Sequence, residues 1–281
     1  MNYLVLGSNG MAGHMIALFL TKRGHNVTGF ARQKGWLSQT ILGDATDKQG
    51  LIKALESSNA EIVINCLGVL NAAVDQKLSD GIYINSVIPH LLAEHIGEKK
   101  LIHISTDCVF SGKRGRYVET DMPDAETMYG KSKALGEVID KHNLTIRTSI
   151  VGPELKQNGI GLFHWFMHQE MAGGYSRVQW SGVTTLQLAK IIETVSRTDL
   201  TGLYHLVNNK TISKYDLLGL FNRYCRTKKA DITMDNTMVC DKSLVDTRRN
   251  VLEQVPDYED MIREMGDWLY LNKELYGQYQ I

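Results

Sequence analysis

The first half of the chain alternates short apolar runs, rich in β-branched residues, with segments whose apolar residues recur at helical spacing. The runs are bounded by polar residues or glycine, as expected of strands covered by helices on both faces. Strands are predicted at Tyr3–Leu6, Asn26–Phe30, Glu61–Ile64, Leu101–Ile104 and Leu144–Arg147. Helices are predicted at Met11–Arg23, Leu51–Glu56, Tyr83–Ile96 and Tyr129–Lys141. This rhythm predicts right-handed crossovers and a doubly wound parallel α/β sheet.

The regular alternation ends after Pro153, where glycine-rich turns separate the apolar segments. Helices are predicted at Leu162–Met171, Leu186–Ser196, Lys214–Tyr224 and Tyr258–Leu275, with one strand at Leu203–Val207. We therefore expect residues 1–152 to form the nucleotide-binding domain. Residues 153–281 would mainly form a smaller C-terminal substrate-binding lobe, and the segment around 186–207 would return to the first domain.

Composition excludes several classes of protein. Of the 281 residues, 43% are hydrophobic and 22% charged, which is enough apolar material for a folded core. Lys plus Arg and Asp plus Glu both number 31, so there is no basic excess to suggest a nucleic-acid partner. The longest apolar run, Met15–Leu20, is far shorter than the roughly 20 residues that span a bilayer, so no membrane association is expected. The four cysteines form no CxxC pair, which favours a reduced, cytoplasmic protein without structural metal.

A glycine-rich turn, Gly7-Ser8-Asn9-Gly10-Met11-Ala12-Gly13, joins the first strand to the first helix. Gly7 permits the tight turn, Gly10 allows backbone to approach a diphosphate, and Gly13 allows the helix to pack closely on the strand. The helix N-terminus offers unpaired N–H groups to an anion. The strand, turn and helix together predict a dinucleotide site, whereas a turn that serves only packing is the alternative.

The end of the second strand bears on cofactor choice. An acidic residue there binds the ribose 2′-hydroxyl of NAD, whereas arginine accepts the 2′-phosphate of NADP. This chain has Arg32 and no acid, so NADP(H) is favoured and NAD(H) remains the alternative. A solvated basic loop is the other interpretation of Arg32. Asp44 could bind the adenine amine or could cap the next helix.

Two further motifs suggest proton transfer. Tyr129 and Lys133 lie four residues apart, which places a phenol and an ammonium on one face of a helix. A free phenol has a pKa of about 10, and a cation beside it would lower that value and make a general acid suited to neutral pH. Thr106 ends the fourth predicted strand, and the carboxyl ends of parallel strands are where such sheets bind ligands. Thr106 could therefore bind the carbonyl oxygen that Tyr129 protonates.

These residues resemble the extended short-chain dehydrogenases/reductases with a Rossmann fold, and most closely the dTDP-4-dehydrorhamnose reductase group. The matching segments are GSNGMAG at 7–13, STDCVFSG at 105–112, Tyr117-x-Glu119-x-Asp121, YGKSKALGE at 129–137, IRTSIVG at 146–152 and GLYHL at 202–206. Two positions depart from the group: Cys108 replaces a usual aromatic residue, and residues 65–71 replace an alanine-rich loop.

The resemblance implies which residues do what. The catalytic set would be Thr106, Tyr129 and Lys133, with Lys133 also holding the nicotinamide ribose. Cofactor contacts would come from Gly7, Ser8, Asn9, Gly10, Met11, Gly13, Arg32, Asp44, Ala45, Cys66, Leu67, Gly68, Asn85, Tyr129 and Lys133. Substrate contacts would come from Asp107, Val109, Arg147 and Thr184. For Arg147 an ion pair within the sheet is an equal alternative to a phosphate contact, and Thr184 is first a helix N-cap. Arg248 and Arg249 could meet a diphosphate or remain solvated.

The implied activity is reduction of the C4 ketone of a nucleotide-linked 4-keto-6-deoxyhexose, for synthesis of cell-envelope polysaccharide precursors. A 4,6-dehydratase would need a carboxylate pair after the threonine, but Asp107 is followed by Cys108. An epimerase that retains NAD and a non-catalytic regulatory subunit that keeps the cofactor pocket remain alternatives. The resemblance also allows a homodimer, and no residue cluster calls for a metal.

Overall fold

The computed structural model describes residues 1–208, 210–248 and 255–281. Its main element is a seven-stranded sheet of parallel strands in the order β11-β6-β5-β4-β1-β2-β3. The strands are β1 (Asn2–Leu6), β2 (Asn26–Ala31), β3 (Thr40–Leu42), β4 (Ile62–Asn65), β5 (Lys100–Thr106), β6 (Leu144–Thr148) and β11 (Gly202–His205). The strand order reverses at β1, so the predicted doubly wound fold is confirmed and its ligand-binding edge lies beyond β1 and β4.

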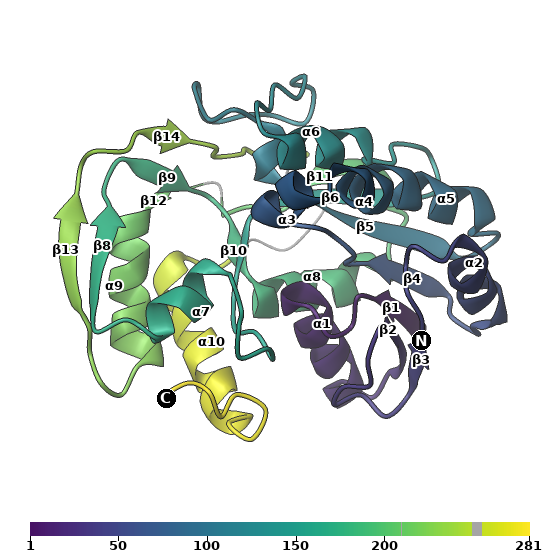
Figure 1. Ribbon diagram of the computed structural model, residues 1–281, viewed down its shortest axis with the longest axis horizontal. Coiled ribbons are helices and arrows are strands. Elements are labelled where there is room, and N and C mark those ends of the chain that lie inside the picture. The colour runs from purple at the N-terminus through teal and green to yellow at the C-terminus, as the bar shows by residue number, and fades with distance from the viewer. Residues whose placement is uncertain (209, 249–254) are drawn as a thin grey trace.

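Helices cover both faces of this sheet (Figure 1). Successive strand residues point to opposite faces, and β1 shows the consequence. Tyr3 and Val5 pack in one apolar cluster with residues of α1 (Met11–Lys22) and α8 (Thr185–Val195). Leu4 and Leu6 pack in a second cluster with residues of α2 (Lys48–Ser57) and α5 (Ile88–His95). Burial on both sides explains why the strands are short and almost wholly apolar.

Two of the predicted helices that cover the sheet are interrupted or end early. The segment predicted at Tyr83–Ile96 begins with a π-helical turn, η1 (Tyr83–Val87), before α5. Pro89 has no N–H to donate, so regular α-helical bonding is interrupted there. The helix predicted from Tyr129 to Lys141 is α6 (Met128–Leu135), which ends at Gly136. A Cβ at Gly136 would clash with the carbonyl oxygen of Asn85, so the chain approaches η1 closely at this point.

Five short elements lie beside the sheet edge that carries the candidate site. They are α3 (Asn71–Gln76), α4 (Leu78–Ile82), the 3₁₀ turn η2 (Asp107–Val109), and the strand pair β7 (Ile150–Val151) and β10 (Val183–Thr184). The three-residue strand β3 was not predicted, since its apolar run is only two residues long.

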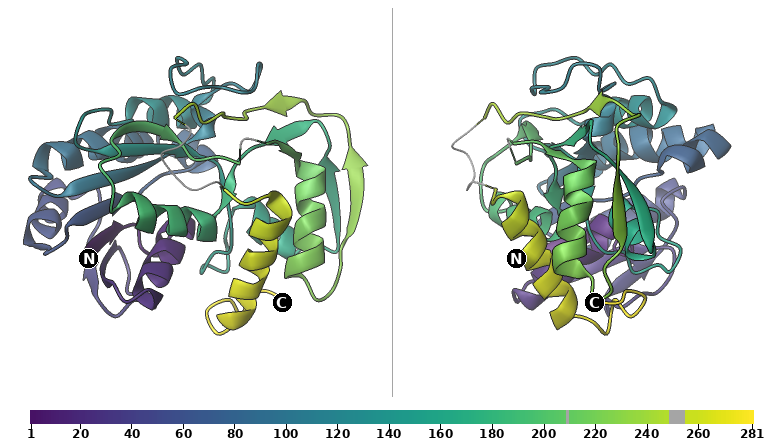
Figure 2. Two further views of the ribbon diagram at one scale, coloured as in Figure 1. Left: turned by 180° about the vertical axis from the view of Figure 1, so that it is seen from behind. Right: turned by 90° about the vertical axis from the view of Figure 1, so that its left-hand side faces the viewer.

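Most of the C-terminal third forms a second layer of strands and helices beside the sheet (Figures 1 and 2). Its elements are α7 (Leu162–Met167), β8 (Met171–Tyr175), β9 (Val178–Trp180), β12 (Ile212–Ser213), α9 (Lys214–Cys225), β13 (Asp231–Asp235), β14 (Cys240–Asp241) and α10 (Tyr258–Leu271). The helix predicted to reach Met171 ends at Met167, and β8 begins at Met171. We call these elements the C-terminal lobe; α8 and β11 lie instead on the large sheet. No helix in the described ranges has the length and apolarity needed to cross a membrane.

Candidate active site

The glycine turn after β1 has the geometry of a phosphate-binding loop. Gly7 has φ +79°, a conformation that other residues rarely adopt, and its N–H donates to the carbonyl of Phe30 at 2.9 Å. A Cβ at Gly13 would clash with the carbonyl oxygen of Gly7, so only glycine lets α1 pack this close. Gly10 precedes α1, and neither a side-chain cap nor an acidic residue in the first turn satisfies the helix N-terminus. The free N–H groups at the start of α1 can therefore donate hydrogen bonds to a bound anion.

The side chains within the turn mostly fix the loop itself. The amide of Asn9 donates to the carbonyl of Gln33 at 2.8 Å, which ties the turn to the loop after β2. Ser8 is fully buried against Gly29, and its hydroxyl has no hydrogen-bond partner among the described residues. Met11 is half-buried at the start of α1. The Asn9 side chain therefore fixes the loop, whereas the Ser8 hydroxyl makes no such bond.

The residues expected near the adenosine end differ in exposure. Arg32 follows β2 directly and is exposed, so its guanidinium is free to meet a phosphate. Asp44 is also exposed and accepts bonds from the N–H and hydroxyl of Thr46 at 2.9 and 2.8 Å. These bonds hold the pKa of Asp44 below its usual value. The alternative that Asp44 caps the next helix is wrong, because Asp47 is the N-cap of α2; Ala45 is buried.

The loop after β4 carries Cys66, Leu67 and Gly68, which were predicted to contact the cofactor. Asn85 is fully buried beneath this loop and both accepts from the N–H of Val69 and donates to its carbonyl, each at 2.9 Å. Asn85 therefore holds the loop rather than facing a ligand. Burial raises the pKa of the Cys66 thiol to about 12, so the thiol stays protonated and unreactive.

Thr106 and Tyr129 come together at the carboxyl end of β5. Thr106 donates from its hydroxyl to Asp107 and accepts from the N–H of Cys108, both at 3.1 Å. Tyr129 lies in the first turn of α6, which Thr127 caps. Its neighbour Gly130 packs against the carbonyl of Cys108, so the phenol lies near Thr106. Burial raises the pKa of Tyr129 above its usual value, and nearby Cys108 and Asp107 raise it further. The phenol therefore keeps its proton at neutral pH.

Lys133 does not have the effect on Tyr129 that the sequence predicts. Its ammonium points into the sheet, where it donates to the carbonyl of Ile104 at 2.8 Å and lies 3.4 Å from Nε2 of His103. The pKa of Tyr129 is raised rather than lowered, because burial raises it and Lys133 is not among the groups that shift it. Burial also lowers the pKa of Lys133 to about 8, against a smaller opposite effect of Glu137.

His103 is a neighbour of the site that the sequence interpretation missed. It is 1% exposed, lies 3.1 Å from the amide nitrogen of Asn65, and contacts Lys133 as described above. Burial and the Lys133 charge hold its pKa well below the usual value, so its ring stays neutral. A histidine inside an apolar strand needs buried partners, and that was the available signal.

Two residues predicted to bind substrate have other roles. Arg147 is 2% exposed, and its guanidinium donates to the carboxylate of Glu137 at 2.6 and 2.7 Å. Arg147 therefore forms an ion pair, but its partner Glu137 follows α6 rather than lying in the sheet, and the predicted phosphate contact is wrong. Thr184 caps α8 by accepting from the N–H of Gln187 at 3.1 Å and is 1% exposed, so its capping role is confirmed.

The other two substrate candidates lie in η2. Val109 is completely buried in a small apolar cluster with Phe110 and Tyr117, so its side chain does not reach a ligand. Asp107 is 9% exposed and stands beside Thr106. No group of three or more His, Cys, Asp or Glu in the described part of the chain could hold a metal ion.

A family model described as the RmlD substrate binding domain matches residues 1–239. The chain belongs to this family. A dTDP-4-dehydrorhamnose reductase of Aggregatibacter actinomycetemcomitans is 28% identical over 232 residues, covering 76% of this chain and 75% of that protein. Methionine adenosyltransferase 2 subunit beta of Danio rerio is 27% identical over 137 residues, 48% and 42% of the two chains.

Among solved structures, dTDP-4-dehydrorhamnose reductase of Bacillus anthracis str. Ames, in complex with NADP, has a TM-score of 0.80. It is 20% identical and covers 94% of this chain and 98% of that one. At this identity the likeness shows the fold alone. The Rossmann fold and the resemblance inferred from the motifs are thereby confirmed for this RmlD-family chain.

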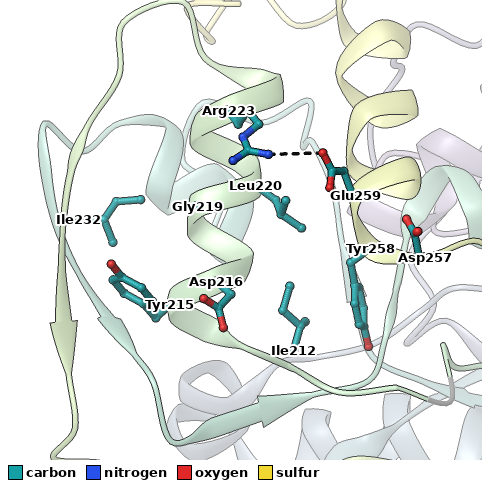
Figure 3. Close-up of a pocket in the computed structure, with 10 residues that line it drawn as sticks. All are labelled: Ile212, Tyr215, Asp216, Gly219, Leu220, Arg223, Ile232, Asp257, Tyr258 and Glu259. Atoms are coloured by element: carbon teal, nitrogen blue, oxygen red, sulfur yellow. Dashed lines mark hydrogen bonds and ion pairs between the residues drawn. The ribbon is translucent and has the colours of Figure 1, made fainter.

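A cavity of about 430 Å³ lies in the C-terminal lobe of this RmlD-family chain, away from Thr106 and Tyr129 (Figure 3). Its lining consists of Ile212, Tyr215, Asp216, Gly219, Leu220, Arg223, Ile232, Asp257, Tyr258 and Glu259. The charged groups in it already have partners: Arg223 pairs with Glu259 at 3.3 Å, and Asp216 and Asp257 bond at the starts of α9 and α10. The catalytic candidates therefore do not lie in this cavity.

Proposed function

We propose that this protein uses NADPH to reduce the C4 ketone of a nucleotide-linked 4-keto-6-deoxyhexose, in the synthesis of cell-envelope polysaccharide precursors. The observation that carries the proposal is that the Thr106 and Tyr129 side chains lie near each other at the carboxyl end of β5, in a chain of the RmlD family. Residues 1–152 would bind the cofactor, and residues 153–281 would mainly bind the sugar nucleotide. The described residues fit a dehydrogenase site that needs one proton donor and no metal.

The residues around the glycine turn fit a dinucleotide. The uncapped start of α1 would take the diphosphate, Arg32 the 2′-phosphate that distinguishes NADP, and Lys133 the nicotinamide ribose. When bound, the cofactor supplies a hydride to the carbonyl carbon. NADP(H) is favoured over NAD(H) because Arg32 is exposed and no acid follows β2.

Tyr129 would donate its proton to the C4 oxygen as negative charge develops on that oxygen. A phenol whose pKa burial has raised does not ionise at neutral pH, so the donor is always loaded. Thr106 would hold the same oxygen. Its hydroxyl now donates to Asp107 and can rotate to the substrate, while the N–H of Cys108 continues to bond its oxygen.

One assay tests the proposal against its two alternatives. The purified protein is given NADPH with dTDP-, UDP- and GDP-linked 4-keto sugars, and both cofactor oxidation and sugar products are followed. Net oxidation of NADPH with a matching amount of reduced sugar supports the reductase. Interconversion of sugars without net oxidation would mean an epimerase. Cofactor binding with no turnover of any nucleotide sugar would favour a regulatory subunit, a role that the partial likeness to an enzyme's beta subunit keeps in view.

The protein would act in the cytoplasm as a homodimer. All four cysteines are free, which suits a reducing compartment. Large apolar side chains are exposed on neighbouring segments: Leu78 and Ile82 on α4, Val87 on η1, Leu135 at the end of α6 and Ile139 in the loop after it. His90 of α5 bonds the carbonyl of Leu135 at 2.8 Å, so these helices are adjacent. Sedimentation of the purified protein tests the dimer, and Leu135→Glu should shift it to monomer.

A further inference from the structure

The arginines suggested by the sequence do not supply a cation for the substrate. Arg147 is buried against Glu137. Arg248 donates to the carbonyls of Thr201 and Leu203 at 2.8 and 2.9 Å, and Arg249 lies outside the described residues. A nucleotide sugar carries at least two negative charges on its diphosphate. A site for it needs a cation that is not already paired.

Lys214 is such a cation. It is the first residue of α9, directly after the N-cap Ser213. Its ammonium lies 5.2 Å from the centre of the Trp180 ring, a cation–π contact that holds the side chain in place. Within the described residues this ammonium has no hydrogen-bond acceptor and no carboxylate at ion-pair distance.

Contacts of Trp180 place Lys214 at the carboxyl edge of the large sheet. The Trp180 ring, over which the ammonium lies, packs against Gly182, and Gly182 packs against the carbonyl of Ser149. Ser149 directly follows Thr148, which pairs with Thr106 of β5. The titratable groups that act on Lys214 are Asp107 and Cys108, which follow Thr106, and Cys240 of β14. Burial lowers the pKa of Lys214 to about 8, and these three groups oppose that shift. A half-buried cation without a partner costs free energy, and an anionic ligand would remove that cost. Lys214 therefore has both the position and the unmet bonding capacity of a ligand-binding group.

We propose that Lys214 is the substrate-binding cation of the C-terminal lobe and that it holds an anionic oxygen of the nucleotide sugar. The inference rests on the proposed function. That oxygen belongs to the diphosphate, to which a lysine donates as a point charge.

The test compares Lys214→Met with wild type in two measurements. In NADPH-dependent reduction of a dTDP-4-keto sugar, the KM of the variant for the sugar nucleotide should be about 10- to 100-fold higher, because one charge-assisted hydrogen bond is lost. Its KM for NADPH should not change. Lys214→Arg should keep most of the affinity. Lys210→Met, an exposed lysine four residues earlier, is the matched control and should behave as wild type.

Calorimetric titration with dTDP and UDP tests the contact directly. Weaker binding of these nucleotides to Lys214→Met, by the same factor as KM, means that Lys214 holds the diphosphate. Unchanged nucleotide binding to the variant overturns that role. Circular dichroism establishes that the variant is folded, and Lys214→Gln replaces it if it is not.

The two proposals fail in different ways. Turnover by wild type with equal KM in Lys214→Met overturns the role of Lys214 and leaves the reductase intact. If the wild-type protein reduces no keto sugar, the proposed reductase activity is wrong, and the nucleotide titration then tests the role of Lys214 by itself. Equal nucleotide affinity of wild type and variant, or no nucleotide binding to either, overturns the role of Lys214.

Discussion

Removal of the Tyr129 hydroxyl tests the proposed chemistry most directly. Tyr129→Phe keeps the ring, which is 8% exposed, and removes only the phenol oxygen near Thr106. Thr106 retains Asp107 as acceptor, so the free energy of unfolding should fall by about 1 kcal/mol or less. A general acid typically contributes a factor of about 10² to 10⁴, and kcat should fall by that factor. Affinity for NADPH should not change.

Stopped assays with excess NADPH and a dTDP-4-keto sugar measure kcat, and fluorescence titration measures cofactor affinity. Tyr258→Phe is a matched control, because it also removes one buried hydroxyl, bonded to the carbonyls of Trp180 and Lys210 at 3.2 and 2.6 Å. The control should keep its kcat. A Tyr129→Phe enzyme with kcat within about tenfold of wild type would show that another group protonates the sugar.

Two other substitutions test the frame of the site and its cofactor choice. Glu137→Gln leaves the guanidinium of Arg147 without its carboxylate, at a position where both side chains are 3% exposed. The free energy of unfolding, measured by urea titration, should fall by about 3–5 kcal/mol. An unchanged urea midpoint would mean that the ion pair does not stabilise the fold. Arg32→Ser should raise KM for NADPH about 10- to 100-fold while KM for NADH stays constant, since only NADPH carries the 2′-phosphate. Equal loss for both cofactors would contradict the assignment of Arg32.

The sheet could be predicted from sequence because its strands are buried on both faces. Such strands appear as short apolar runs between polar boundaries, and every strand from β1 to β6 except β3 was found in that way. Helix ends were harder, because contacts between distant segments set them. Gly136 ends α6 where the chain meets η1, and no local pattern around residue 136 records that contact.

The candidate site was predicted only in part, for the same reason. Thr106 and Tyr129 were found from motif and strand end, which are local signals. That Arg147 would face Glu137 rather than solvent depends on which side of β6 it occupies and on where α6 ends. Lys214 was missed because it is a single lysine at the start of an amphipathic helix. Its nearness to Asp107 follows only from the packing of the C-terminal lobe.

Burial shifts the pKa of the acid and of the cations of this site in opposite directions, and these shifts determine how ligand binding changes at alkaline pH. It raises the pKa of Tyr129 but lowers the pKa of Lys133 and of Lys214 to about 8. As pH rises, both ammonium groups lose their protons well before the phenol does. Affinity for cofactor and sugar nucleotide should therefore fall above about pH 8 while kcat at saturation persists. In the unfolded chain both lysines keep their protons up to about pH 10.5, whereas in the folded protein they lose them near pH 8. Between these two pH values the unfolded chain binds more protons, so the free energy of unfolding should rise with pH even as ligand affinity falls. Steady-state profiles of KM and kcat from pH 6 to 10, with urea titrations at each pH, measure both trends; kcat falling first would mean that the phenol ionises before the lysines lose their charge.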